Sequence, residues 1–247
     1  MYNDKSVSNE KPPVLVLKGI SKTFGGLEAL SDISASVYEG EILGLLGPNG
    51  SGKTTLFNCI TGVTPLTSGK IILDGIDITG MKSWEIARRG ISRSYQITQP
   101  FSNMSVRQNV MVGAFNRIRD YAEAEEYAFQ RLRLFGLAEK SVVLAKHLNL
   151  GERKKLEIAK SLSTEPKILL LDEVMAGLTQ AEAMEISEIV RETNRSGITV
   201  IMIEHNVDTI MSVCERLIVL NFGKKIMEGT PREAVLNEQV IEAYLGS

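Results

Sequence analysis

The sequence predicts an α/β fold in which helices cover a central, mostly parallel sheet. Two runs, residues 168–171 and 198–203, are almost wholly apolar, as in parallel strands that are buried on both faces. A glycine-rich stretch at 47–52 lies between a short apolar run and a helical pattern. A segment of helical periodicity, about 100–163, separates the first strands from the two apolar runs.

Short strands are predicted in the first third of the chain, where apolar and β-branched residues cluster between glycine-containing turns. These clusters lie at 14–18, 33–37, 42–46 and 71–74. The pair Asp74-Gly75 is typical of a hairpin turn. A second hairpin is predicted around residues 221–224, between runs at 217–220 and 225–228.

Helix starts are marked by capping patterns. Ser105-x-x-Gln108 and Asp120-x-x-Glu123 both have the form of a capping box. Thr230-Pro231 predicts the start of the last helix, because proline is favoured in a first helical turn.

The composition is that of an ordinary globular protein. The 247 residues are 43% hydrophobic and 23% charged, which is enough for one domain with subdomains. The chain has 30 acidic and 28 basic residues and a net charge of -2, so it has no general excess of positive charge for binding phosphate backbones. We therefore expect no nucleic-acid partner.

Location is predicted from three absences in the sequence. Residues 1–13 are polar, are expected to be flexible, and do not resemble a signal peptide. The apolar runs are far shorter than the roughly 18 residues of a membrane span. Cys59 and Cys214 lie in apolar helical patterns without metal-ligand spacing, as core thiols of a reducing compartment do. These observations predict a cytoplasmic protein.

One stretch matches the phosphate-binding pattern G-x-x-x-x-G-K-[ST] between a strand and a helix. Its residues are Gly47, Pro48, Asn49, Gly50, Ser51, Gly52, Lys53 and Thr54, and Thr55 is grouped with them. Glycines let the backbone amides turn toward a phosphate, and a helix N-terminus favours negative charge. We expect Lys53 to reach the β- and γ-phosphates and the Thr54 hydroxyl to meet Mg²⁺. A glycine-rich turn with a solvated lysine is the alternative.

Polar residues follow the two apolar runs, where such a sheet binds ligands. Asp172 would hold Mg²⁺ through water, and Glu173 would act as the general base toward an attacking water. Acidic residues commonly end strands, so this pattern alone is weak. His205 follows the second run and would lie near the same phosphates.

Gln96 and His147 have competing interpretations. Gln96 follows a β-like stretch at 91–95, and its amide could bridge the metal, water and γ-phosphate, although most loop glutamines are simply solvated. His147 is better explained as a partly exposed residue at a helix end.

Taken in order, these motifs resemble the ATP-binding subunits of ABC transporters along nearly the whole chain. Phe24 stands where that family stacks an aromatic ring on adenine. The other matches are the Walker A loop, Gln96 in the Q-loop, residues 148–152 at the signature position, 168–173 as Walker B, and His205 as the switch histidine. The resemblance implies ATP and Mg²⁺ as cofactors and an active ATPase.

The resemblance also implies an ABC-type P-loop NTPase fold, with a RecA-like core, an antiparallel β subdomain and a helical subdomain. Residues 14–96 and 165–247 would form the nucleotide-binding core with the β subdomain, and 97–164 the helical subdomain.

The chain is most similar to the ATPases of branched-chain amino-acid importers, at residues 93–96, 156–159, 203–205 and 244–246. Urea and amide importers share much of this pattern. The similarity implies transmembrane permease subunits, a second ATPase subunit of the same or a different chain, and an upstream solute-binding protein. The subunit would be held on the inner face of the cell membrane through the permease.

Three alternatives are a non-transport ABC ATPase, an exporter ATPase subunit and a small-molecule P-loop kinase. The first generally has long coiled-coil insertions or basic arms, which this sequence lacks. A kinase would have an arginine-rich lid, but Arg131 and Arg133 are explained by a solvated helix face.

The signature segment departs from the usual L-S-G-G-Q, because only Leu148 and Gly151 are retained. Asn149, Leu150 and Glu152 replace the others, yet Asn149-x-x-Glu152 is still a capping box. We expect Asn149, Gly151 and Glu152 of the opposing subunit to complete the nucleotide site in trans.

Two further residues depart from the family's pattern, and a third, Phe101, bears on the permease. Val174 replaces a proline that is common after the catalytic glutamate, and Thr179 replaces an aspartate at the family's dimer interface. Leu150 replaces a glycine that normally allows close backbone approach, so Leu150 and Thr179 together lead us to expect weak dimerisation of this chain alone. Phe101 follows Pro100 and either docks the permease or packs inward.

Overall fold

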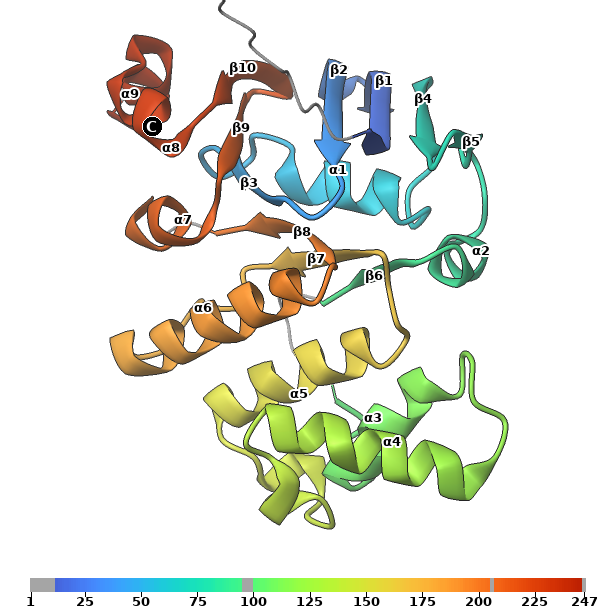
Figure 1. Ribbon diagram of the computed structural model, residues 1–247. Helices are drawn as coiled ribbons and strands as arrows, with labels where there is room; N and C mark the ends of the chain where they lie inside the picture. Colours follow the sequence, from blue (N-terminus) through green and yellow to red (C-terminus); the bar gives the residue numbers. More distant parts are fainter. Residues whose placement is uncertain (1–11, 95–99, 205–206, 246–247) are drawn as a thin grey trace, which may run out of the picture.

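The computed structural model describes residues 12–94, 100–204 and 207–245. In this part of the chain, helices pack on two sheets (Figure 1). One sheet has the strand order β10-β9-β3-β8-β7-β6, and the other has the order β2-β1-β4-β5. The strands are β1 (Pro13–Phe24), β2 (Leu27–Tyr38), β3 (Ile42–Leu46), β4 (Ser68–Leu73), β5 (Ile76–Asp77), β6 (Ile91–Arg93), β7 (Ile168–Asp172), β8 (Thr199–Ile203), β9 (Arg216–Asn221) and β10 (Lys224–Gly229).

The larger sheet confirms the predicted central parallel sheet. Strands β9, β3, β8, β7 and β6 run parallel, and only β10 is antiparallel to its neighbour. Every residue of β3, β7 and β8 is buried, which explains their apolar sequences. Because parallel strands end at the same edge, the glycine-rich loop, Asp172 and Glu204 come to one edge of the sheet.

The smaller sheet is antiparallel, as the resemblance implied. Asp74 and Gly75 have φ values of 48° and 76° and form the predicted turn between β4 and β5. Phe222 and Gly223 form the second predicted hairpin turn, between β9 and β10.

The helices are α1 (Lys53–Ile60), α2 (Ser83–Arg88), α3 (Val106–Ala114), α4 (Tyr121–Leu134), α5 (Leu150–Leu162), α6 (Gln180–Arg195), α7 (Val207–Val213), α8 (Pro231–Leu236) and α9 (Glu238–Leu245), with short 3₁₀ helices η1 (Ala138–Lys140) and η2 (Ala145–His147). Ser105, Asp120, Asn149 and Thr230 cap helices, since each side chain accepts from the backbone N–H three residues later. The reciprocal bond of a capping box is present at Ser105, Asn149 and Thr230. Thr230 caps α8, so the single last helix that was predicted is divided into α8 and α9. No helix among these combines the length and apolarity of a membrane span.

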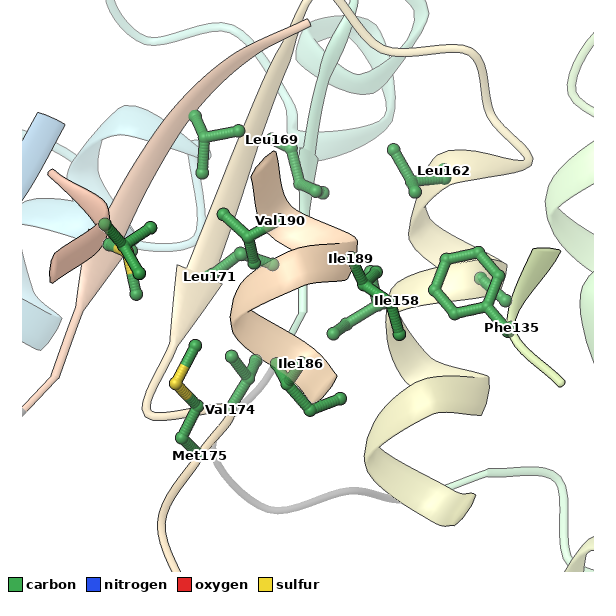
Figure 2. Close-up of a cluster of buried hydrophobic side chains, with 14 of the residues drawn as sticks. Phe135, Ile158, Leu162, Leu169, Leu171, Val174, Met175, Ile186, Ile189 and Val190 are labelled. Atoms are coloured by element: carbon green, nitrogen blue, oxygen red, sulfur yellow. The ribbon is translucent and has the colours of Figure 1, made fainter. Parts of the chain in front are cut away.

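Alternate residues of the central strands enter two apolar clusters on opposite faces of the sheet. Ile168 and Leu170 face α1 and the antiparallel sheet. Leu169 and Leu171 face the helices α5 and α6, and Figure 2 shows this packing around Ile158 and Ile186. Burial of the central sheet on both faces fixes the edge at which the polar residues meet.

Both cysteines are buried free thiols, which confirms that they belong to the core. Burial raises the pKa of Cys59 to about 11 and that of Cys214 to about 12. The thiols are therefore protonated at neutral pH and have little nucleophilic character.

Candidate functional site

The predicted phosphate loop lies between β3 and α1, and its shape depends on glycine. Gly47, Gly50 and Gly52 have φ values of 143°, 78° and 103°. A Cβ atom on Gly47 would lie 2.1 Å from the carbonyl oxygen of Leu220, so no side chain fits there. The loop leads into the N-terminus of α1, whose first amides have no partner within the helix and can bind an anion.

Lys53 is buried at the start of α1 and lies against its own loop. Its Nζ donates to the carbonyl oxygens of Gly47 at 2.7 Å and Pro48 at 3.0 Å, and to the Ser51 hydroxyl at 3.4 Å. Burial lowers the pKa of Lys53, and the nearby charges of Glu173 and Asp172 oppose that shift. The ammonium group is thus placed among oxygen acceptors, where a phosphate oxygen could replace a carbonyl.

The loop forms one wall of a cleft of about 610 Å³, a volume suited to a small-molecule ligand. The structure brings together Phe24, the loop and Glu173, which were predicted to share a site. The cleft is lined by Phe24, Leu27, Glu28, Ala29, Asn49, Gly50, Ser51, Gly52, Lys53, Thr54, Thr55, Glu173, Phe222 and Gly223.

Two exposed aromatic rings stand at this cleft. Phe24 is 48% exposed, and Phe222 is 85% exposed. Phe222 was not predicted as a site residue, although an exposed aromatic residue in a tight turn was a usable signal. The Phe222–Gly223 turn is held to the loop because the Gly223 amide donates to the Ser51 carbonyl at 3.0 Å.

Asp172 ends β7 and forms a buried ion pair with Arg93. The Arg93 Nη2 atom lies 2.5 Å from Asp172 Oδ2, and the two side chains are only 4% and 2% exposed. Among the described residues, the other carboxylate oxygen, Oδ1, is buried without a hydrogen-bond partner. Such an orphaned oxygen is a fitting ligand for a divalent cation or its water.

Glu173, the next residue, has strained backbone geometry. Its φ is 50°, in the left-handed region that non-glycine residues rarely adopt. Its amide donates to the Ile203 carbonyl at 2.9 Å, and its carbonyl accepts from Lys154 Nζ at 2.9 Å. These bonds hold the peptide while the side chain lines the cleft.

Glu204 is a buried carboxyl group that the sequence did not mark as a site residue. Its Oε1 accepts from the Met175 amide at 2.9 Å. Burial raises the pKa of Glu204 to about 7, against the opposing effects of that hydrogen bond and of the charge on Lys154. Glu204 and Lys154 therefore connect β8 and α5 to the segment that follows β7.

The signature segment begins α5 and lies apart from this cleft. Asn149 accepts from the Glu152 amide at 2.9 Å, and Glu152 accepts from the Asn149 amide at 3.1 Å, so the predicted capping box is present. A Cβ on Gly151 would meet Glu182 Oε1 at 2.7 Å. Within the described lining of the cleft, no residue comes from 149–152.

The two departures from the family's pattern at positions 174 and 179 have local explanations. Thr179 caps α6, because its hydroxyl accepts from the Glu182 amide at 3.3 Å. Val174 is buried in the apolar cluster below β7.

The remaining predicted residues have different outcomes. Gln96 and His205 lie outside the described residues. His147 ends η2 and is exposed, as expected. Phe101 does not pack inward, since it is 49% exposed with the Lys160 ammonium 5.6 Å from its ring centre. Arg133 was predicted to lie on a solvated face of a helix, and it is exposed on α4.

Comparison with known families matches two segments of the chain. Residues 30–176 match the family described as ABC transporter. Residues 224–247 match a family described as branched-chain amino acid ATP-binding cassette transporter.

Curated relatives share about a third of their residues with this chain. LivG of Escherichia coli (strain K12), a high-affinity branched-chain amino acid transport ATP-binding protein, is 37% identical over 95% of this chain and 98% of its own. BraF of Pseudomonas aeruginosa, which has the same description, is 35% identical over the same shares. LptB of Escherichia coli (strain K12), a lipopolysaccharide export ATP-binding protein, is 37% identical over 94% of this chain and 97% of its own.

A solved structure also matches nearly the whole fold. It is the ADP conformation of an ATP-binding cassette of an ABC transporter, with a TM-score of 0.88 and 31% identity over 96% of this chain and all of that one. The fold, the phosphate loop and these matches agree. The chain belongs to the ABC transporter family and is one of its nucleotide-binding ATPase subunits.

Proposed function

We propose that the cleft binds ATP with Mg²⁺ and that Glu173 starts hydrolysis. The observation that carries this proposal is that the phosphate loop, Lys53 and Glu173 line one cleft. Phe24 at the same cleft offers a ring for stacking on adenine.

The loop residues bind and orient the phosphates. Lys53 moves from the carbonyls of its own loop to the β- and γ-phosphates, and the amides at the start of α1 complete the anion site. The Glu173 carboxylate accepts a proton from the attacking water, a contribution of roughly 10²- to 10⁴-fold. Gln96 and His205 are proposed to orient the water and the γ-phosphate.

The residues at the sheet edge also fit Mg²⁺. The Thr54 hydroxyl, the Gln96 amide and Asp172 would hold it, and Asp172 presents a buried oxygen without a partner in the described part of the chain. When bound, Mg²⁺ would neutralise charge on the β- and γ-phosphates.

We also propose a nucleotide-binding core with its β subdomain at residues 14–96 and 165–247, and a helical subdomain at 97–164.

Two copies, or this chain and a second ATPase, are proposed to close around two nucleotides. Asn149, Gly151 and Glu152 do not line the cleft of their own chain, which supports their acting on the opposite subunit. Their helix N-terminus would bring amides and a positive dipole end to the γ-phosphate.

The transported solute is proposed to be a branched-chain amino acid or a related amino acid or amide, taken up through separate permease subunits. Similarity to LivG and BraF and the match at 224–247 support this assignment. The subunit would sit on the inner membrane face through its permease, downstream of a solute-binding protein. An exporter role is the second candidate, because LptB has comparable identity.

The test is reconstitution of the chain in proteoliposomes with the permease subunits that co-purify with it and a solute-binding protein for branched-chain amino acids. We expect ATP-dependent uptake of labelled leucine, and none with Glu173→Gln, which should still bind ATP. Lys53→Ala should lose ATP binding itself. Uptake of an amide but not leucine would restrict the solute to that part of the proposal, and uptake of urea alone would correct it. Export of lipid in place of uptake would overturn the importer assignment.

A further inference from the structure

Arg93 has a buried charge that the proposed function leaves unexplained. It is the last residue of β6, and its guanidinium group is 4% exposed. A buried charge is costly unless it is paired and hydrogen-bonded. Its contacts therefore indicate what it does.

The guanidinium group joins α1 to β7. Nη2 lies 2.5 Å from Asp172 Oδ2, and Nη1 donates to Asn58 Oδ1 at 2.6 Å. The same group lies over the ring of Phe57, 5.4 Å from its centre. Asn58 and Phe57 belong to α1, the helix that follows the phosphate loop.

The backbone of Arg93 is also fixed. It pairs with Leu170 in the parallel register of β6 and β7, and the Ser94 amide donates to the Leu170 carbonyl at 2.9 Å. The Ser161 hydroxyl of α5 donates to the Arg93 carbonyl at 3.2 Å. Both the backbone and the guanidinium group of Arg93 are thus fixed by contacts.

The pair divides the two oxygens of Asp172 between different environments. Oδ2 is bound by Arg93, whereas Oδ1 is buried with no hydrogen-bond partner among the described residues. A carboxylate held by one oxygen cannot turn freely. Its second oxygen therefore points in one defined direction.

We infer that Arg93 is a positioning residue for Mg²⁺: it binds Oδ2 of Asp172 and so keeps the carboxylate turned with Oδ1 available to the cation. This inference rests on the proposed role of Asp172 at the metal. Partners that bind a metal-ligating carboxylate commonly change metal affinity by about 10- to 100-fold when removed. Arg93 itself does not line the nucleotide cleft described above.

The test measures the affinity of the full chain for ATP by calorimetry, with EDTA and across a series of Mg²⁺ concentrations. Arg93→Met keeps an apolar stem beside Phe57 but removes the charge. We expect unchanged ATP affinity in EDTA and a loss of about 10- to 100-fold in the affinity for Mg²⁺. Arg195→Met is the control, because that side chain is 66% exposed in a surface ion pair.

A double variant separates an action through Asp172 from a general structural role. In an Asp172→Asn background, Arg93→Met should cause no further loss of Mg²⁺ dependence. Equal weakening of ATP binding with and without Mg²⁺ would make Arg93 merely structural and overturn the inference. Tighter binding of Mg²⁺ by Arg93→Met would also overturn it.

If Arg93→Met does not fold, Arg93→Lys tests the same inference. Lysine keeps the charge but loses the fork that spans Asn58 and Asp172. A weaker Mg²⁺ dependence at unchanged metal-free affinity supports the inference, and wild-type dependence overturns it. Failure of the proposed function is distinguishable, because wild-type protein would then show no ATP binding, or Asp172→Asn would leave Mg²⁺ dependence unchanged.

Discussion

The hydroxyl of Tyr244 accepts a hydrogen bond of 2.9 Å from the amide of Gly47, 197 residues earlier in the chain. Gly47 is buried and begins the phosphate loop. Its amide is therefore satisfied by a side chain of α9, within the segment that matches the branched-chain family. This contact connects the last helix to the nucleotide site.

Tyr244→Phe should weaken both folding and nucleotide binding, because it leaves the Gly47 amide without its partner. An unsatisfied buried amide costs about 1–3 kcal/mol. Urea unfolding and ATP titration measure the two effects. Tyr121→Phe is the matched control, since Tyr121 is 58% exposed. A Tyr244→Phe protein that equals this control in both measurements would show that the contact has no role.

Glu204→Gln should make stability less dependent on pH. The pKa of Glu204 is raised by burial from 4.5 to about 7, so the folded chain binds a proton more tightly than the unfolded chain does. Stability is therefore lost as pH rises from 4.5 to 7, by about 3 kcal/mol at most. Below pH 4.5 this penalty is absent.

Urea unfolding at pH 5 and pH 8 measures the difference. The glutamine variant should gain stability relative to wild type at pH 8 compared with pH 5. Glu139→Gln, an exposed change in η1, should give no such gain. Parallel pH profiles for wild type and Glu204→Gln would mean that Glu204 does not titrate in this range.

Gly113→Ala should destabilise the contact between α3 and α5. A Cβ at this position would lie 2.0 Å from the Ser163 hydroxyl and 2.5 Å from the Lys160 carbonyl oxygen. The crowding should cost about 1–3 kcal/mol, which outweighs the roughly 1 kcal/mol that alanine gains in a helix. Gly26→Ala is the control in unfolding experiments, because nothing lies within 4 Å of its added Cβ. Equal stability of the two variants would contradict the close packing.

The central strands and the capped helices could be predicted because their signals are local. Ile42–Leu46 has the bounds that were expected, since it is short, apolar and bounded by turns. Strands Pro13–Phe24 and Leu27–Tyr38 extend well beyond the predicted 14–18 and 33–37. Their outer parts carry polar, partly exposed residues, and register shifts interrupt the alternation of polar and apolar positions.

The contacts that complete the site could not be predicted in this way. Arg93 and Asp172 are 79 residues apart, so no local sequence pattern predicts their ion pair. The phosphate loop was found because all its groups lie in eight consecutive residues. In the sequence, Arg93 belongs to residues 93–96, which are similar to the branched-chain importer ATPases. Its ion pair with Asp172 depends on the pairing of β6 with β7, which the sequence does not specify.

We expect Asn149 to act on the nucleotide of the opposite subunit. Asn149→Asp is the suitable variant, because aspartate also caps a helix while its charge opposes a γ-phosphate. Gly151→Asp is less suitable, since its side chain would meet Glu182 of its own subunit. Loss of one such phosphate contact typically lowers the rate by roughly 10²- to 10³-fold.

Two mixed dimers, purified through different tags on the two subunits and assembled with the permease, give opposite results for the two arrangements. Lys53→Ala paired with Asn149→Asp should retain hydrolysis, because completion in trans places both changes in one site and leaves the other intact. The double variant paired with wild type should be inactive, because each site then carries one change. If the double variant paired with wild type hydrolyses ATP and the first pair does not, Asn149 serves the nucleotide of its own chain. The direction of this difference decides the arrangement even when dimerisation is weak, because both preparations contain the same two substitutions in equal amounts.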